Sequence, residues 1–185
     1  MINELIKKRR STRAFSSQSI DADTLMSLFE ASRWAASSMN EQPWRFVYRL
    51  KDDNPQEFDE LFSTLMDGNK SWAGSAPLLI AVLAKTHFAY KDRPNRHYMY
   101  DTGQAVATML VQLTDMGLVA HQMGGFHIDQ AKEILSVDDD YEIAVIIAVG
   151  YPGDINTLPD DLKKRESGPR KRNELNDFVF KNRLN

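Results

Sequence analysis

Two uninterrupted apolar runs, at residues 78–84 and 143–149, constrain the fold of this 185-residue chain more than any other feature. The second run is the centre of a longer stretch, residues 141–150, that is rich in β-branched side chains. Such runs are typical of strands buried on both faces, because helices cover both sides of their sheet. Both runs are too short to cross a bilayer, which takes about 20 residues. We therefore expect a sheet whose strongest strands lie between two layers of helices.

The rest of the chain alternates between helical and extended patterns. Apolar spacing predicts four helices, over residues 2–9, 55–68 and 96–116 and over a stretch that begins at Asp21 or Asp23 and ends near residue 36. Alternating apolar residues predict strands over residues 44–50 and 119–123. Residues 69–72 read as a polar connection, residues 85–95 as an exposed loop, and Asp129 as the cap of a short helix. This order predicts an α+β sandwich with a mixed or antiparallel sheet, in one domain spanning residues 1–185.

Composition excludes several functional classes. With 42% hydrophobic and 26% charged residues the chain is typical of a globular protein. A net charge of -3 argues against a general nucleic-acid binder. The chain contains no cysteine, and its four histidines lack the spacing of a metal site, so we expect neither a thiolate nucleophile nor a metal. Residues 1–20 lack an apolar signal-peptide core, and we expect a cytoplasmic protein without a membrane partner.

Residues 9–15, with the sequence RRSTRAF, hold three arginines and two hydroxyl side chains within five consecutive positions. Arginine presents a planar fork of donors that matches phosphate, and Ser or Thr adds a short donor beside it. A helix is predicted to end here, so the side chains themselves must supply the positive charge. The stretch suits a phosphate monoester, although an exposed basic helix end explains these residues equally well.

Two further features can each be interpreted either as part of a ligand site or as ordinary local structure. Gly124 and Gly125 follow a predicted strand, where a glycine pair lets the backbone approach a planar ligand or simply makes a tight turn. Arg170 and Arg172 follow the last strand, where their spacing places both side chains on one side of an extended segment. A solvated basic tail is the alternative for this second pair.

A second polar stretch, residues 37–46 with the sequence SSMNEQPWRF, leads into the first predicted strand. Alone it is ordinary loop chemistry. Together with RRSTRAF it resembles the FMN-dependent nitroreductase family, which shows R-[RH]-S-x-[RK]-x-F followed by S-S-x-N-x-Q-P-W. The resemblance spans nearly the whole chain. It implies the nitroreductase-like three-layer sandwich and an intertwined homodimer with two FMN sites at the subunit interface.

The resemblance also implies which residues bind the flavin. Residues at the phosphate or ribityl chain would be Arg9, Arg10, Ser11, Arg170 and Arg172, with Arg13 nearer the ring. The loop that reaches FMN bound mainly by the other subunit would contribute Ser37, Ser38, Met39 and Gln42. Asn69 would be a hydrogen-bond partner, and Gln122, Met123, Gly124 and Gly125 would line the ring's reactive edge. Met39 and Gly124 depart from the residue types usual in the family at their positions.

The implied activity is an NAD(P)H-dependent FMN oxidoreductase. NADH or NADPH would reduce the flavin, and a nitroaromatic, quinone or related small acceptor would then reoxidise it by a ping-pong mechanism. The cofactor carries this chemistry, so no catalytic protein residue is expected. The sequence leaves three alternatives open: a specialised flavin reaction such as reductive dehalogenation or flavin breakdown, a flavin-binding redox sensor, and a phosphate-binding module without flavin.

Overall fold

The centre of the fold is a four-stranded sheet in the order β1-β2-β4-β3, seen in a computed structural model that describes residues 2–184. The strands are β1 (Trp44–Leu50), β2 (Leu78–Lys85), β3 (Val119–Met123) and β4 (Tyr141–Gly150). Every neighbouring pair is antiparallel, so the sheet is not mixed. The two apolar runs form the central strands β2 and β4, as predicted.

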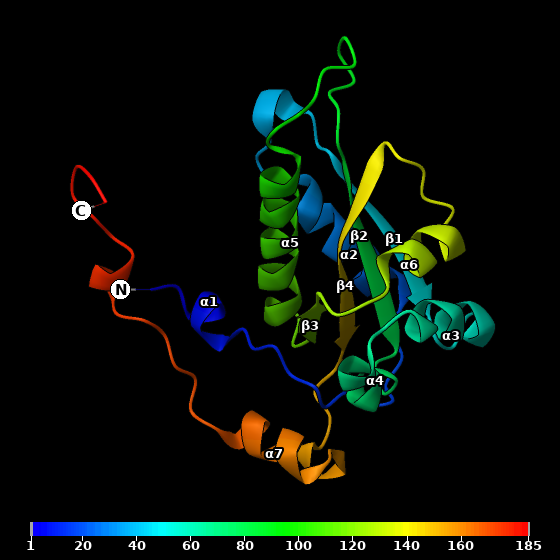
Figure 1. Cartoon of the computed structure of the whole chain (residues 1–185). Helices are drawn as coiled ribbons and strands as arrows, with labels where there is room; N and C mark the ends of the chain where they lie inside the picture. The colour runs from blue at the N-terminus through cyan, green and yellow to red at the C-terminus, as the bar shows by residue number, and fades with distance from the viewer. Residues whose placement is uncertain (1, 185) are drawn as a thin grey trace.

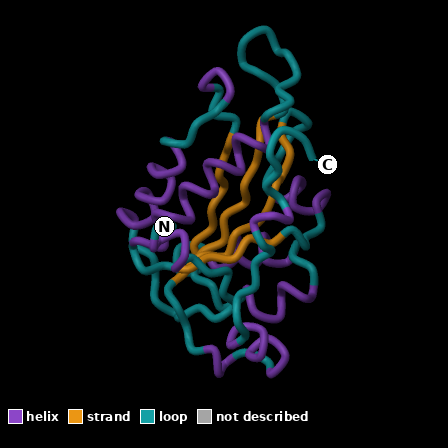
Figure 2. Tube along the Cα trace, turned by 90° about the vertical axis from the view of Figure 1, so that its left-hand side faces the viewer, coloured by secondary structure: helices purple, strands orange, loops and turns teal. Residues whose placement is uncertain are grey.

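Helices cover both faces of this sheet, which gives the predicted three layers (Figure 1). Helices α2 (Ala22–Arg33) and α5 (Tyr98–Asp115) pack on the face that carries Ile80 and Ile147. Helices α3 (Pro55–Ser63), α4 (Asp67–Ala73) and α6 (Ile128–Ile134) pack on the face that carries Leu79 and Ile146. Figure 2 shows the strands lying between these two groups of helices.

A β-bulge in the central pair explains why β4 does not alternate strictly. Val82 pairs with Val145 and Leu83 pairs with Ile143, so Ala144 is an extra residue on β4. The extra residue shifts the alternation of side chains by one position. Ile143 therefore joins the same core as Ile146, three residues later.

Local chemistry fixes the ends of the helices. Asn3 accepts a hydrogen bond from the backbone of Leu5 at the start of α1 (Glu4–Lys8), and Asp21 accepts one from Thr24 at the start of α2. Gly117 adopts a φ of 79° after α5, a left-handed conformation that costs glycine little. The chain can thereby turn directly from α5 into β3.

Three local predictions were wrong. The helix predicted over residues 55–68 ends at Ser63 as α3, because the chain becomes extended at residues 65–66, where Leu65 forms a β-bridge with Phe126. Residues 69–72 lie within α4 and are not a polar connection, because Trp72 and Ala73 are buried and their packing outweighs the poor helix propensity of Gly68 and Asn69. Asp129 is not the cap of α6 but lies in its first turn, and His127 occupies the cap position. None of the helices within residues 2–184 is long and apolar enough to span a membrane.

The chain leaves the compact part of the fold after α7 (Asp160–Ser167). The following segment, residues 168–184, extends past α1 and away from the sheet (Figure 1). Its apolar side chains are exposed, with 69% of Leu175, 58% of Phe178 and 60% of Val179 accessible. We call residues 173–184 the C-terminal arm.

Candidate functional site

A basic cavity of about 280 Å³ lies where the N-terminal segment meets the segment after α7. Its lining includes the six residues Arg9, Arg10, Ser11, Arg13, Arg170 and Arg172. Arg170 joins the two segments by donating hydrogen bonds to the backbone carbonyls of Lys7 and Arg9. The two basic stretches of the sequence, 161 residues apart, thus form one cavity.

Positive charge in this cavity is only partly compensated. Within the described residues, Arg13 alone among the lining arginines forms an ion pair, with Glu166 at 3.0 Å. Burial lowers the pKa of the Arg9 guanidinium, and the neighbouring charges of Arg172 and Arg170 lower it further. A cluster of like charges is stabilised by an anion that binds among them, so the cavity is suited to a phosphate group.

Arg13 and Trp72 connect this cavity to strand β3. The guanidinium carbon of Arg13 lies 5.9 Å from the centre of the Trp72 ring, and the centres of the Trp72 and His121 rings lie 4.6 Å apart. His121 Nδ1 contacts the backbone oxygen of Thr12 at 3.1 Å. Burial lowers the pKa of His121, and the charge of Arg13 adds to this effect. Arg13, Trp72 and His121 thus form a contact chain from the basic cavity to β3.

The end of β3 lies against α4. Asn69 Nδ2 donates to the carbonyl of Gly125 at 2.9 Å, and a Cβ atom at Gly125 would lie only 3.1 Å from the same nitrogen. A Cβ atom at Gly124 would meet nothing within 4 Å, so the space over this residue is open. Met123 is buried and Gln122 is exposed. Asn69 thus fixes the glycine pair, and Gly124 leaves its backbone accessible.

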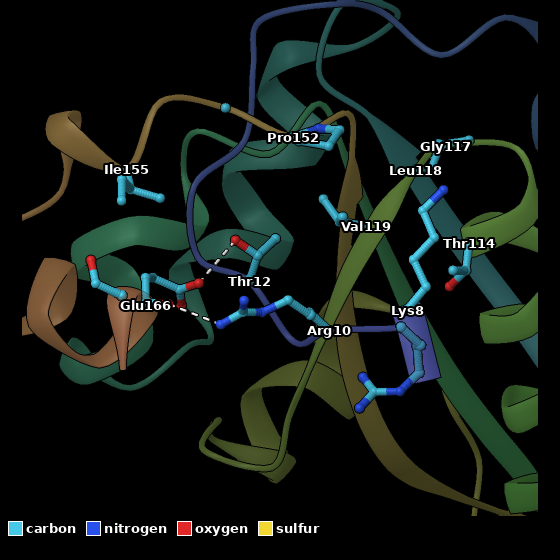
Figure 3. Close-up of a pocket in the computed structure, with 13 residues that line it drawn as sticks. Lys8, Arg10, Thr12, Thr114, Gly117, Leu118, Val119, Pro152, Ile155 and Glu166 are labelled. Atoms are coloured by element: carbon cyan, nitrogen blue, oxygen red, sulfur yellow. Dashed lines mark hydrogen bonds between the residues drawn. The ribbon is translucent and has the colours of Figure 1, made fainter. Parts of the chain in front are cut away.

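A second, larger cavity of about 640 Å³ adjoins the basic one (Figure 3). It lies between the N-terminal segment, the end of α5 and α7, and shares Arg9, Arg10 and Glu166 with the basic cavity. Its lining combines apolar residues such as Leu118 and Val119 with the basic residues Lys8, Arg9 and Arg10.

The loop of residues 37–42 lies elsewhere, beside the beginning of α5. Asp101, in the first turn of α5, accepts a hydrogen bond from the Ser38 backbone at 2.9 Å. The larger cavity, which shares Arg9, Arg10 and Glu166 with the basic one, adjoins the opposite end of α5, roughly 20 Å away at 1.5 Å per residue between positions 101 and 114. Ser37, Ser38, Met39 and Gln42 are therefore not brought together with the basic cavity within one chain.

This loop holds an unusual backbone conformation. Met39, Asn40 and Gln42 have positive φ angles of 56°, 55° and 50°. A conformation of this kind costs energy in non-glycine residues and persists only where neighbouring contacts hold it. Ser37 Oγ accepts from the Gln42 backbone at 3.0 Å and provides one such contact. The loop is thus held in one defined shape by polar contacts.

Sequence reasoning missed several residues of these sites, among them Thr12, Asp101, His121 and Glu166. Thr12 was visible within RRSTRAF, and Glu166 was visible as a single acid inside a basic run, residues 163–172. Asp101 and His121 gave no signal, because their roles depend on partners more than 60 residues away.

The fold and cavities together define a three-layer α+β protein with a basic cavity between its N-terminal segment and the segment after α7. The chain belongs to the nitroreductase family, whose family model matches residues 6–61 and 49–151. An uncharacterized 15.4 kDa protein of Mycolicibacterium smegmatis is 31% identical over 128 residues, which cover 68% of this chain and 85% of that protein. Mouse iodotyrosine deiodinase 1 is 25% identical over 88% of this chain, which spans 65% of the mouse enzyme.

Solved structures agree with this assignment. An oxidoreductase containing FMN superposes with a TM-score of 0.94 at 34% identity, over 100% of this chain and 93% of the other. A putative nitroreductase from Desulfovibrio desulfuricans in complex with FMN superposes with a TM-score of 0.75 over 100% of both chains. Its 23% identity makes it a likeness of fold alone.

Proposed function

We propose that this protein is an FMN-dependent oxidoreductase, folded as a single domain, that uses NADH or NADPH to reduce small acceptors. The observation that carries the proposal is the basic cavity, in which Arg9, Ser11 and Arg172 converge from distant parts of the chain. Membership of the nitroreductase family and similarity to an FMN-containing oxidoreductase support the same conclusion.

The residues of this chain fit FMN. Uncompensated arginines suit its phosphate, since charge-assisted hydrogen bonds to phosphate are among the strongest in proteins. The open space over Gly124 leaves backbone N–H groups accessible to a planar ring. When bound, FMN would accept hydride from a nicotinamide and pass electrons to a nitroaromatic, quinone or related compound. The protein's part is to bind, orient and polarise, which requires no acid or nucleophile.

Donor and acceptor are proposed to use one site in turn. The sequence holds no separate dinucleotide-binding fingerprint, so a nicotinamide would bind only at the flavin and leave before the acceptor enters. This predicts parallel lines in double-reciprocal plots.

We also propose that the complete site needs two copies of the chain. The loop of residues 37–42 lies far from the basic cavity of its own chain, so a second copy would have to bring it there. Two uncovered surfaces support this arrangement. The α5 residues Tyr100, Gly103 and Ala107 form an exposed face, and the C-terminal arm exposes apolar side chains.

Reductive dehalogenation of an aromatic compound is the second candidate, because iodotyrosine deiodinases from mouse and rat are each 25% identical over 88% of this chain. The two activities differ in the acceptor and share the flavin. A panel of nitroaromatics, quinones and halogenated phenols, offered to the reduced protein, separates them.

The decisive experiment is the absorption spectrum of purified protein, followed by anaerobic addition of NADH or NADPH. We expect a yellow protein with about one non-covalent FMN per chain that bleaches on reduction and recovers its colour with an acceptor. Protein that is colourless and takes up no FMN from solution would refute the proposal. Bound FMN that no nicotinamide reduces would favour a redox sensor.

A further inference from the structure

The segment of residues 9–13, which contributes Arg9, Arg10, Ser11 and Arg13 to the basic cavity, has no regular secondary structure of its own. An irregular segment presents its donors in a fixed array only if other elements hold it. Arg170 holds its beginning through the carbonyls of Lys7 and Arg9, and His121 contacts it at the Thr12 carbonyl. A single residue of α7, Glu166, adds three further hydrogen bonds.

Glu166 contacts the segment at three points. Its carboxylate oxygen Oε1 accepts from Arg13 at 3.0 Å, Oε2 accepts from the Thr12 hydroxyl at 3.1 Å, and its backbone oxygen accepts from Arg10 at 2.9 Å. Figure 3 shows the contacts of Glu166 to Thr12 and Arg10 among the residues that line the larger cavity. The side chain is only 6% exposed, so water competes little for these bonds.

An acid in this place is unexpected on electrostatic grounds alone. Among the described residues, Glu166 is the one acidic residue that lines the basic cavity, and its negative charge opposes the binding of an anion there. The contacts indicate what offsets this cost. The carboxylate neutralises Arg13 and holds it over Trp72, while Arg9 and Arg172 have no acidic partner among the described residues.

We propose that Glu166 is a positioning residue, which orders the segment of residues 9–13 so that Arg9 and Ser11 face the phosphate of FMN. The proposal rests on the proposed function for the identity of the ligand. Under this proposal Arg13 contributes to phosphate binding only indirectly, because its guanidinium group is paired with Glu166.

Loss of the negative charge of Glu166 should strengthen FMN binding, whereas loss of its positioning contacts should weaken FMN binding. Glu166→Gln therefore separates the two effects. The matched control is Asp161→Asn, which makes the same charge change at an exposed position of the same helix. If Glu166 positions the segment, Glu166→Gln weakens FMN binding about tenfold, as expected for a lost charge-assisted hydrogen bond. Riboflavin, which lacks the phosphate, changes much less, and Asp161→Asn changes neither. If only charge matters, Glu166→Gln binds FMN as well as or better than the wild type, and the proposal is wrong.

Amide hydrogen exchange of residues 9–14, measured without flavin, gives a readout that is independent of the ligand. We expect exchange there to be about tenfold faster in Glu166→Gln and unchanged in Asp161→Asn. Unchanged exchange in both variants overturns the proposal. Faster exchange over the whole chain, with equal losses for FMN and riboflavin, would mean that Glu166 supports the fold in general, and this also overturns it.

Thr12→Val is a second variant that removes the bond to Oε2 without changing any charge. We expect a smaller loss of FMN affinity than in Glu166→Gln, and no further loss when the two changes are combined, because both act through one network. Fully additive losses contradict a shared network. A wild-type protein that binds neither flavin refutes the proposed function, while the exchange of residues 9–14 still decides whether Glu166 orders the segment.

Discussion

At the scale of single residues, Arg172 offers the clearest test of the basic cavity. It lies close enough to Arg9 to lower that residue's pKa, yet among the described residues it has no acidic partner. A charge-assisted hydrogen bond to phosphate is worth about 1.5–3 kcal/mol, or one to two decades in Kd. We expect Arg172→Ala to weaken FMN by about that factor and to leave riboflavin nearly unaffected, as measured by fluorescence titration of the apoprotein.

Arg172→Lys should recover only part of the loss, because lysine lacks the planar fork. Arg183→Ala, on the exposed arm, is the matched control and should change neither affinity. Equal losses for the two flavins in Arg172→Ala would show that this arginine supports the fold and not the phosphate.

His121 predicts how stability depends on pH. Burial and Arg13 lower the pKa of its imidazole below 6.5 in the folded protein, so the unfolded chain binds more protons as the pH falls below that value. The free energy of unfolding should therefore decrease as the pH falls through 6.5 toward the folded pKa. Urea unfolding between about pH 5 and 8 checks this expectation. His121→Gln should flatten the dependence in this window, and an unchanged slope in the variant would assign the effect to other groups.

At the scale of elements, the loop of residues 37–42 and the hairpin at residues 86–95 form one unit. The hairpin is closed by hydrogen bonds from Phe88 to Arg93 and from Asn95 to Thr86. Glu41 Oε1 accepts from the Ala89 backbone at 2.6 Å and so connects the hairpin to the loop. Glu41→Ala should release the hairpin and increase the rate of tryptic cleavage after Lys91, by about tenfold if one charge-assisted bond is lost.

The control for this variant is Asp53→Ala, which removes an exposed acid elsewhere and should leave cleavage after Lys91 unchanged. A cleavage rate in Glu41→Ala equal to that of the wild type would mean that the hairpin is held without Glu41.

Elements with long apolar patterns could be predicted from the sequence, and those that depend on tertiary packing could not. Strands β2 and β4 follow the runs at 78–84 and 143–149 closely, because burial on both faces leaves a continuous apolar signal. Helix α4 was missed because it begins with Asp67, Gly68 and Asn69, which are poor helix formers, and is stabilised by burial of Trp72. The bulge after Val82 has no local signature at all.

At the scale of the whole molecule, the basic cavity was partly predictable. The arginines of residues 9–13 and 170–172 could be assigned to one phosphate site because they match a known pattern, and the structure brings them to one cavity. Glu166 could not be assigned, since its role follows from contacts with residues more than 150 positions away. Whether these residues bind FMN stays a prediction until the titrations are made.

The last prediction concerns the assembly. The exposed face of α5 carries Tyr100, Gly103 and Ala107, and small residues let two helices approach closely. We expect the FMN-loaded protein to sediment as a dimer at micromolar concentration.

Ala107→Arg places a long charged side chain on this face and should shift the protein toward monomer. It should also weaken FMN binding, although residue 107 does not line its own chain's basic cavity. The loop of residues 37–42 would no longer reach the flavin of the other copy. Gln56→Arg on α3 makes the same charge change on the opposite layer and should alter neither property. A wild-type monomer that retains FMN at micromolar concentration would show that one chain completes the site alone, and the two-copy arrangement would then be wrong.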